Sequence, residues 1–442
     1  MKIPSTTTWP NNISYLEKVN WIKNNQHVCL NPFQSYYYQI EFDGQRNPQL
    51  QKTVLNNSCC CSIQPNTDIE KIKNNVFNST LGKECQVCWN SETQTGTSER
   101  TMSLMNVPVD KVNSFIESGN TDGFHYRIKF SNLCNLACRT CSPTFSSKYA
   151  QTYKSIIPRE LYNDIGSDPE VWASITTSII ESCKTHSLVT VTLLGGESLI
   201  QPGAVKLIDW LVNNQLPVSL NITTNLTNLN TKVVERLHHI KHIEFALSID
   251  SVNTNYEYVR WPAKFNTIEE NLAVISTYTN ASLTIQPVWS LNNIFYINEF
   301  LDWWHKWFTT NKEIPIRNVV MHRPHFMTIQ NLPVRYRRQL LEVLTNALSH
   351  PIFTRHLQQS LHHYISGITD FLKTESIVYD HFDLFLYETA RQDRATNSDF
   401  KTGNWRFYNI LTQQDQHLYN QHPDLKLLPT EQQIVYNLHL PL

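Results

Sequence analysis

Three cysteines that lie close together in the chain are the residues best suited to chemistry. Cys134, Cys138 and Cys141 have a C-x-x-x-C-x-x-C spacing and form, with their neighbours, the three-cysteine loop (residues 131–144). Three thiolates on one loop can bind three of the four irons of a cubane [4Fe-4S] cluster. The fourth iron then keeps an open coordination position, as a catalytic zinc does, and can bind a substrate. The alternatives are a zinc site and buried structural cysteines.

A pair of glycines forms a second candidate site. Gly195 and Gly196 precede Glu197, and together they form the glycine turn (residues 195–197) in a chain that has 11 glycines among 442 residues. Paired glycines allow the backbone to approach a ligand closely, and a carboxylate is a suitable partner for an ammonium group. The alternative is an ordinary turn between a strand and a helix.

A second group of thiols occupies the first hundred residues. Its members are Cys29, Cys59, Cys60, Cys61, Cys85 and Cys88. Cys29, one of the three consecutive cysteines and the C-x-x-C pair would together supply four thiolates, which suit a fully ligated cluster for electron transfer or structure. Which of the consecutive cysteines is a ligand stays open. A four-thiolate zinc site is the alternative, because the same pattern is typical of zinc ribbons.

The elements that position these residues alternate between strand and helix from about residue 124. Strands are predicted at 124–130, 188–194, 218–224, 243–249, 282–289 and 316–321, and helices at 204–212, 231–239, 267–278 and 294–308. Strands joined by helices favour a parallel sheet, with right-handed connections that curl it into an open or partial barrel. In such sheets the chemistry lies at the carboxyl ends of the strands. An earlier strand is predicted at 36–42, and helices at 334–348, 351–372 and 374–393.

The three-cysteine loop and the glycine turn resemble the radical S-adenosylmethionine (AdoMet) superfamily, whose signature cysteines follow the first strand of a partial (β/α)6 barrel. The resemblance implies that the cluster on the loop binds AdoMet and that the glycine turn receives the amino group of AdoMet. It further implies contacts of the AdoMet ribose or carboxylate with Asn225, Ser248 and Asp250, and a pairing of that carboxylate with Arg260. The alternatives are strand-end groups that cap helices and a surface arginine.

This resemblance also implies an activity. AdoMet would be cleaved reductively to methionine and a 5′-deoxyadenosyl radical, which abstracts hydrogen from a substrate. The electron would come from a donor such as flavodoxin or ferredoxin. The chemistry requires a dry barrel interior. No residue is assigned a catalytic role toward the substrate itself.

The N-terminal cysteines extend the resemblance. The pattern C-x-x-C-W-x-x-E-x-x-x-G-x-S-x-R at residues 85–100 resembles twitch or SPASM-like radical AdoMet proteins with an auxiliary [4Fe-4S] cluster, although in better-studied enzymes this module follows the barrel. A charged stretch at 388–394 resembles the same group and receives no function. The expected division is a cysteine-rich auxiliary iron-sulfur domain at 1–115, the partial barrel at 116–325 and a mainly helical extension at 326–442.

The substrate is less constrained than the reaction. Enzymes with SPASM or twitch modules often modify ribosomally made peptides, so a peptide is the first expectation. A small metabolite or a nucleoside is the alternative within the same enzyme class. A zinc-stabilised, non-catalytic binding protein on a decayed barrel is the alternative from a different class.

Composition excludes several other classes. The chain has 37 basic and 38 acidic residues, so it lacks the positive charge that nucleic acid binding requires. No apolar stretch reaches the roughly 18 residues of a membrane helix. The N-terminus resembles neither a secretory signal nor a transit peptide, which favours a cytoplasmic protein with reduced thiols.

Overall fold

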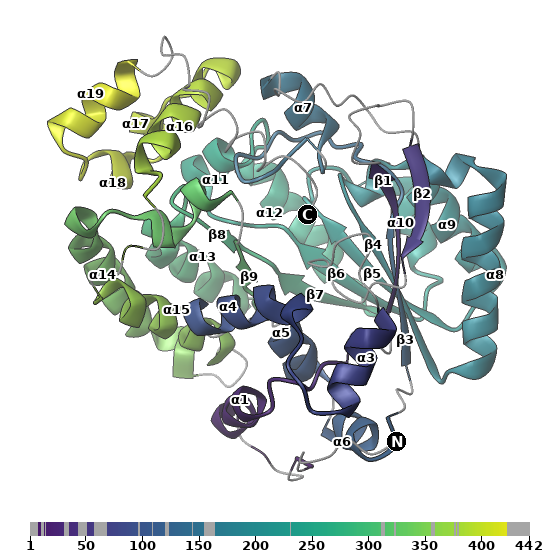
Figure 1. Cartoon of the computed structure of the whole chain (residues 1–442). Helices are drawn as coiled ribbons and strands as arrows, with labels where there is room; N and C mark the ends of the chain where they lie inside the picture. Colours follow the sequence, from purple (N-terminus) through teal and green to yellow (C-terminus); the bar gives the residue numbers. More distant parts are fainter. Residues whose placement is uncertain are drawn as a thin grey trace.

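A seven-stranded sheet forms the centre of the structure, which is a computed structural model (Figure 1). The described residues are 8–9, 13, 15–30, 35–42, 51–56, 69–95, 98–107, 109–119, 123–143, 145–153, 164–229, 231–310, 314–321, 324–354, 359–374, 377 and 380–421.

The sheet has the strand order β2-β1-β3-β4-β5-β6-β7. Its strands are β1 (Ser35–Phe42), β2 (Gln51–Asn56), β3 (Gly123–Lys129), β4 (Leu188–Leu194), β5 (Val218–Thr224), β6 (His242–Leu247) and β7 (Ala281–Ile285). β1 pairs in parallel with β3, and each strand from β3 to β7 pairs in parallel with the next. Only β2 is antiparallel to its neighbour, β1. The predicted α/β class with a parallel sheet is therefore confirmed.

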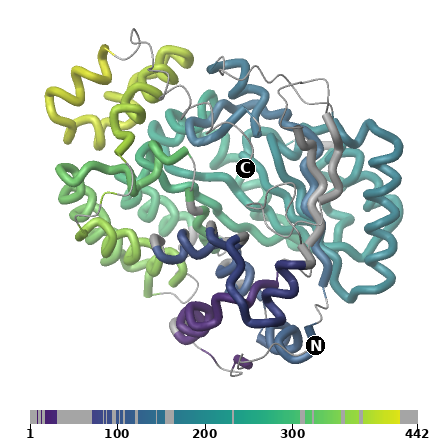
Figure 2. The backbone as a smooth tube through the Cα atoms, in the orientation of Figure 1, coloured from purple at the N-terminus to yellow at the C-terminus, as the bar shows by residue number. Residues whose placement is uncertain are grey.

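One face of the sheet is apolar because side chains alternate along each strand. Ile128 on β3, Ile222 on β5 and Phe245 on β6 are fully buried in the main hydrophobic core. Helices follow the successive strands (Figure 2), namely α8 (Pro169–Thr185), α9 (Pro202–Asn213), α10 (Thr231–Leu237), α12 (Phe265–Ser276) and α13 (Ile297–Thr310). Since each parallel connection needs a crossover, these helices place the carboxyl ends of the parallel strands β3 to β7 at the same edge.

Polar residues gather in the alternate positions of the strands. His125 on β3 lies 2.6 Å from the Thr192 hydroxyl on β4, and Glu244 on β6 pairs with Arg317 at 3.4 Å. Burial lowers the pKa of His125 to about 3, with further lowering by Arg127 and then Arg317. Arg317 follows β7 in the sequence, yet it affects a residue on β3.

The predicted strand at 282–289 is interrupted. β7 ends at Ile285, and β8 (Val288–Trp289) pairs with β9 (Val319–Val320) in a separate two-stranded parallel sheet. Pro287 explains the break because proline has no backbone N–H for the ladder. The predicted strand at 316–321 is reduced to β9 and a single bridge between Ile285 and Ile316. The partial (β/α)6 barrel therefore stays a prediction.

The region after residue 325 is helical, as predicted, and packs into the same core as the sheet. Its elements are α14 (Val334–Leu348), α15 (Gln359–Leu372), α16 (Phe382–Thr396), α17 (Phe400–Gly403), α18 (Trp405–Tyr408) and α19 (Gln413–Gln421), with a 3-10 helix at Pro351–Thr354. Two predicted boundaries are wrong: the helix at 351–372 begins only at Gln359, and the one at 374–393 begins at Phe382. That second helix continues to Thr396, and Asn397, with a left-handed φ of 50°, ends it.

The N-terminal region contributes both to the sheet and to a core of its own. β1 and β2 extend the main sheet. The helices of this region are α1 (Tyr15–Asn24), α3 (Ile69–Phe77), α4 (Gln86–Thr95), α5 (Glu99–Asn106) and α6 (Val109–Ser118). Val28, Leu104 and Phe115 are fully buried in a second hydrophobic cluster, separate from the main core. None of the described helices has the length and apolar character needed to cross a membrane.

Candidate functional site

The three-cysteine loop begins directly after β3 and is held in place by segments that are distant in sequence. The backbone N–H of Ala137 donates to the Trp261 carbonyl, and that of Arg139 donates to the Val259 carbonyl, both at 2.8 Å. The acceptors follow or end α11 (Asn253–Val259). On the other side, the N–H of Ser147, the first residue of α7 (Ser147–Tyr153), donates to the Asn132 carbonyl at 2.8 Å. The described residues of the loop form no helix or strand, so these bonds fix its shape.

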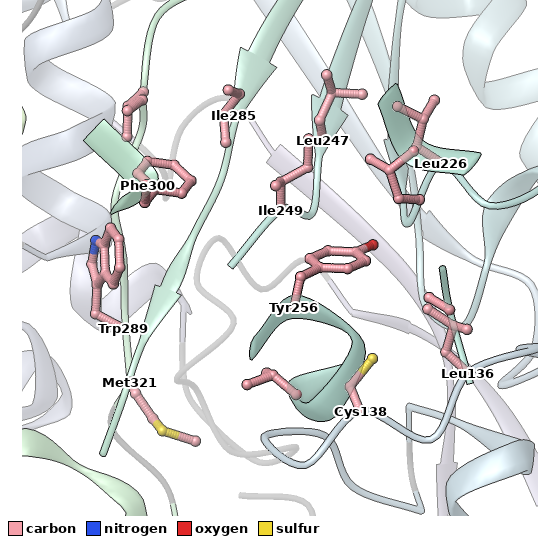
Figure 3. Close-up of a cluster of buried hydrophobic side chains, with 14 of the residues drawn as sticks. Leu136, Cys138, Leu226, Leu247, Ile249, Tyr256, Ile285, Trp289, Phe300 and Met321 are labelled. Atoms are coloured by element: carbon pink, nitrogen blue, oxygen red, sulfur yellow. The ribbon is translucent and has the colours of Figure 1, made fainter. Parts of the chain in front are cut away.

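Of the three thiols, Cys138 is buried, whereas Cys134 and Cys141 are partly buried. Cys138 is 9% exposed and lies among apolar side chains such as Leu136 and Tyr256 (Figure 3). Burial raises the pKa of all three thiols, for Cys141 to about 12. The Cys134 thiolate would raise the pKa of both other thiols further, and the Cys141 thiolate would raise that of Cys138. Within the described residues, no three histidine, cysteine, aspartate or glutamate side chains are grouped so that they could hold one metal ion.

Two charged residues predicted for the site form a pair beside Cys138. The Arg260 guanidinium donates to the Asp250 carboxylate at 2.8 Å and lies 3.7 Å from the Cys138 sulfur. Asp250 is fully buried, and its second oxygen accepts the Val288 N–H at 2.9 Å. Arg260 is 8% exposed, so the alternative of a surface arginine is wrong. Its positive charge opposes the effect of burial on the Cys138 pKa.

The glycine turn lies directly against the three-cysteine loop. The Glu197 N–H donates to the Leu133 carbonyl at 2.8 Å, and Gly196 has a left-handed φ of 52°. A Cβ atom at Gly196 would overlap the Leu133 carbonyl oxygen. Gly195 also has a positive φ, of 75°. The glycines are therefore needed for the backbone conformation and for the close approach of the two segments.

Glu197 joins the glycine turn to the end of β5. Its carboxylate is 1% exposed and accepts the Thr224 hydroxyl at 2.7 Å, the Asn225 N–H at 2.6 Å and the Leu199 N–H at 3.2 Å. Burial raises the pKa of Glu197, and these hydrogen bonds oppose that rise. A carboxylate has about four acceptor positions, so three internal bonds leave room for one more donor.

The remaining predicted residues lie at the ends of neighbouring strands. The Asn225 amide donates to the Asn135 side chain at 2.9 Å and lies 4.0 Å from the Cys134 sulfur. The backbone N–H of Ser248, just after β6, donates to the Thr224 carbonyl at 2.9 Å, and Ser248 is half-buried. Sequence reasoning did not identify Asn135, although it lies within the cysteine motif.

The N-terminal motif has a clear structural role. Arg100 is 2% exposed and pairs with Glu92 at 2.5 Å, and its guanidinium donates to the carbonyls of Ile22, Asn25 and Val28. The Glu92 carboxylate also accepts the Ser98 hydroxyl at 2.6 Å. These bonds connect the segment that leads into Cys29 with the helix that carries Cys88. Cys59, Cys60 and Cys61 lie outside the described residues.

Fold and site together define an α/β protein with a parallel sheet and a buried three-thiol loop at the carboxyl edge of that sheet. No family model matches the chain. In sequence, the chain is similar to the sporulation killing factor maturation protein SkfB of Bacillus subtilis (strain 168), with 22% identity over 178 residues. The match covers 40% of this chain and 38% of SkfB, so the chain spans less than half of that relative.

Solved structures show weaker overall similarity. Streptococcus suis SuiB bound to S-adenosylmethionine has a TM-score of 0.36 and 17% identity, over 57% of this chain and 54% of SuiB. The protein anSMEcpe with bound AdoMet has a TM-score of 0.37 and 17% identity, over 51% of this chain and 60% of anSMEcpe.

The raised thiol pKa values predict slow alkylation of the metal-free protein. Because only the thiolate reacts, Cys141 should be alkylated at least about tenfold more slowly in the folded protein than in denaturant at pH 8. In the folded protein the alkylation rate should still increase with pH above 9, because the pKa of Cys141 is raised to about 12. In the denatured protein the alkylation rate should level off. Mass spectrometry of alkylated peptides over pH 7–10 would measure both. Equal rates in the two states would contradict the burial described here.

The contact of the glycine turn predicts that Gly196→Ala disrupts the site. The left-handed conformation alone costs about 1–3 kcal/mol for a non-glycine residue, and the overlap with Leu133 adds to it. Gly123→Ala is the matched control, because its new Cβ would lie 3.6 Å from the nearest atom, in ordinary contact. Urea unfolding should show a loss of less than about 1 kcal/mol for the control. Equal losses would show that the two segments separate readily.

Proposed function

We propose that the protein is a radical AdoMet enzyme. The observation that carries the proposal is the contact between the three-cysteine loop and the glycine turn at the carboxyl edge of a parallel sheet. In open parallel sheets, ligands bind outside this edge. The sequence similarity to SkfB supports the same interpretation.

The residue types present suit a cluster and AdoMet, although the described side chains are not grouped around one metal position in this structure. Cys134, Cys138 and Cys141 would hold a [4Fe-4S] cluster, because thiolates are the usual ligands of such clusters and three of them leave one iron open. When bound, this cluster supplies the electron for the reductive cleavage of AdoMet. Glu197 would receive the AdoMet ammonium group at its remaining acceptor position, with Gly195 and Gly196 bringing the backbone close.

The chain itself supplies the electrostatic environment of the site. Arg260 places a positive charge 3.7 Å from the Cys138 sulfur, which favours the thiolate form that a cluster needs. Asp250 holds that guanidinium in place and neutralises it in part. Arg260 would also meet the AdoMet carboxylate, and Asn225 and Ser248 would contact the ribose or the carboxylate from the strand ends.

We propose an auxiliary [4Fe-4S] cluster on Cys29, Cys85, Cys88 and one of the consecutive cysteines. The ion pair between Arg100 and Glu92 supports this proposal. Arg100 also donates to the Val28 carbonyl, so it connects the segment before Cys29 with α4. Such a cluster would exchange an electron with the substrate or position it. The auxiliary region, the barrel region and the helical extension would then act as three functional parts of one enzyme.

We propose a ribosomally made peptide as the substrate. The similarity to SkfB, a maturation protein of a killing factor, supports a peptide rather than a small metabolite. A flavodoxin or ferredoxin would supply electrons.

Replacement of single cysteines separates the two proposed clusters. Cys138→Ala should abolish formation of 5′-deoxyadenosine from AdoMet, because one of three ligands of the first cluster is lost. Cys88→Ala should retain uncoupled AdoMet cleavage. Cys183→Ala is the control, because Cys183 is a partly buried thiol outside both clusters. Anaerobic iron and sulfide analysis with a chromatographic assay gives the answer, and equal loss in Cys138→Ala and Cys88→Ala proteins that remain folded would contradict the division.

The substrate class is tested separately. A peptide encoded beside this protein's gene should change in mass when incubated with reconstituted enzyme, AdoMet and a reductant. The same incubation with the Cys138→Ala protein should leave the mass unchanged. Retention of AdoMet cleavage without modification of any neighbouring peptide would favour a small metabolite or nucleoside.

A further inference from the structure

We propose that Asp393 in the helical extension is a positioning residue for the three-cysteine loop and acts through Arg139. Arg139 lies between Cys138 and Cys141 in the sequence. The proposal goes beyond the proposed function, on which it rests only in taking the loop as the cluster site. Sequence reasoning gave neither residue a role, although Asp393 falls in the charged stretch at 388–394.

Arg139 is fully committed to contacts within the chain. It is 1% exposed, and its Nη2 pairs with the Asp393 carboxylate and donates to the Ser398 hydroxyl at 2.7 Å. Its Nε donates to the Tyr258 carbonyl at 2.9 Å, and its guanidinium lies 3.6 Å from the centre of the Tyr258 ring. A buried guanidinium with this many partners fixes the backbone that carries it.

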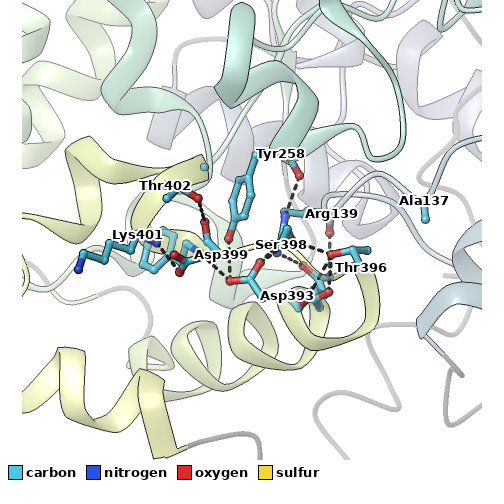
Figure 4. Close-up of polar contacts among 12 residues, drawn as sticks. Ala137, Arg139, Tyr258, Asp393, Thr396, Ser398, Asp399, Lys401 and Thr402 are labelled. Atoms are coloured by element: carbon cyan, nitrogen blue, oxygen red, sulfur yellow. Dashed lines mark hydrogen bonds and ion pairs between the residues drawn. The ribbon is translucent and has the colours of Figure 1, made fainter.

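Asp393 is the centre of the network in the extension (Figure 4). Besides Arg139, its carboxylate accepts the Phe400 N–H at 2.8 Å, the Tyr419 hydroxyl at 2.7 Å and the Ser398 hydroxyl at 3.0 Å. Asp393 therefore joins α16, α17 and α19 to the loop. The separation of 254 residues between Arg139 and Asp393 shows that the loop depends on a distant part of the chain.

Two further contacts of α16 reach the same loop. The Gln392 amide donates to the Arg139 carbonyl at 3.3 Å. Arg391 donates to the Tyr153 carbonyl at 2.7 Å, and the Tyr153 hydroxyl in turn donates to the Ala137 carbonyl at 2.9 Å. These bonds fall on Ala137 and Arg139, the two neighbours of Cys138. The extension therefore holds the backbone on both sides of that ligand.

A positioning role follows from the chemistry of the loop. The loop has no helix or strand of its own, yet it must present three thiols to one cluster in a fixed geometry. The other backbone partners of the loop, Val259 and Trp261, follow Tyr258 within three residues of the chain. Arg139 also contacts Tyr258. Loss of the Asp393 charge would leave a buried, unpaired guanidinium in the loop, which is strongly unfavourable. The loop would then move to expose Arg139 to water.

The test compares Asp393→Asn with Asp415→Asn. Asp415 is a matched control in the same extension, because it is 3% exposed and accepts hydrogen bonds from Arg335, Tyr336 and Thr412, but forms no hydrogen bond or ion pair with the described residues of the loop. In the metal-free protein, Asp393→Asn should increase the alkylation rate of Cys138 and Cys141 by about tenfold, because local opening exposes the thiols. Asp415→Asn should leave these rates within about twofold of the wild type, since it weakens a different part of the extension.

A second readout uses the reconstituted protein. Asp393→Asn should bind less iron at the loop, or give an altered electron paramagnetic resonance spectrum of the reduced cluster, while Asp415→Asn should match the wild type in both. Arg139→Lys keeps the charge but loses the planar fork, and it should give an intermediate alkylation rate. This variant provides the answer if Asp393→Asn does not fold, as judged by circular dichroism.

The outcomes separate this proposal from the proposed function. If the wild type binds no iron-sulfur cluster, the proposed function fails, while the alkylation of the metal-free protein still tests positioning. If Asp393→Asn and Arg139→Lys both retain wild-type alkylation rates, or change them no more than Asp415→Asn does, the positioning role is wrong.

Discussion

The hydrogen bonds that the three-cysteine loop receives from the rest of the chain are the constraint on which the site depends. A loop without helix or strand must satisfy its buried backbone groups elsewhere. Its partners are the segment after α11, the first residue of α7, the glycine turn and α16. In the sequence these partners range from Ser147 in the sheet region to Gln392 in the helical extension. The geometry of the thiols is therefore a property of the tertiary structure as a whole.

Buried charges around the loop are arranged in pairs. Arg260 is bound by Asp250, and Arg139 by Asp393. Because an isolated buried charge is strongly unfavourable, each guanidinium requires its carboxylate. The pairing keeps positive charge close to the thiols without leaving it uncompensated. Cluster binding needs thiolates. Nearby positive charge favours deprotonation of the thiols, whereas burial opposes it.

The N-terminal region shows the same principle on a smaller scale. Arg100 is buried, is neutralised by Glu92 and donates to three carbonyls before Cys29. Arg100 and Glu92 belong to a motif that resembles an auxiliary-cluster region. In the structure they have a structural role, since they fix the segments that carry the thiols.

The sequence by itself determined the α/β class, the strands at 188–194 and 218–224, the helix at 334–348 and the local motifs, because alternation, helical periodicity and short spacings are local properties. It also indicated that the cysteine loop and the glycine turn follow neighbouring strands. Only the tertiary structure decided that β1 joins the main sheet, that Pro287 ends one predicted strand early, and that Arg139 meets Asp393. These features depend on contacts between distant segments, and no local pattern encodes which distant segment a residue will meet.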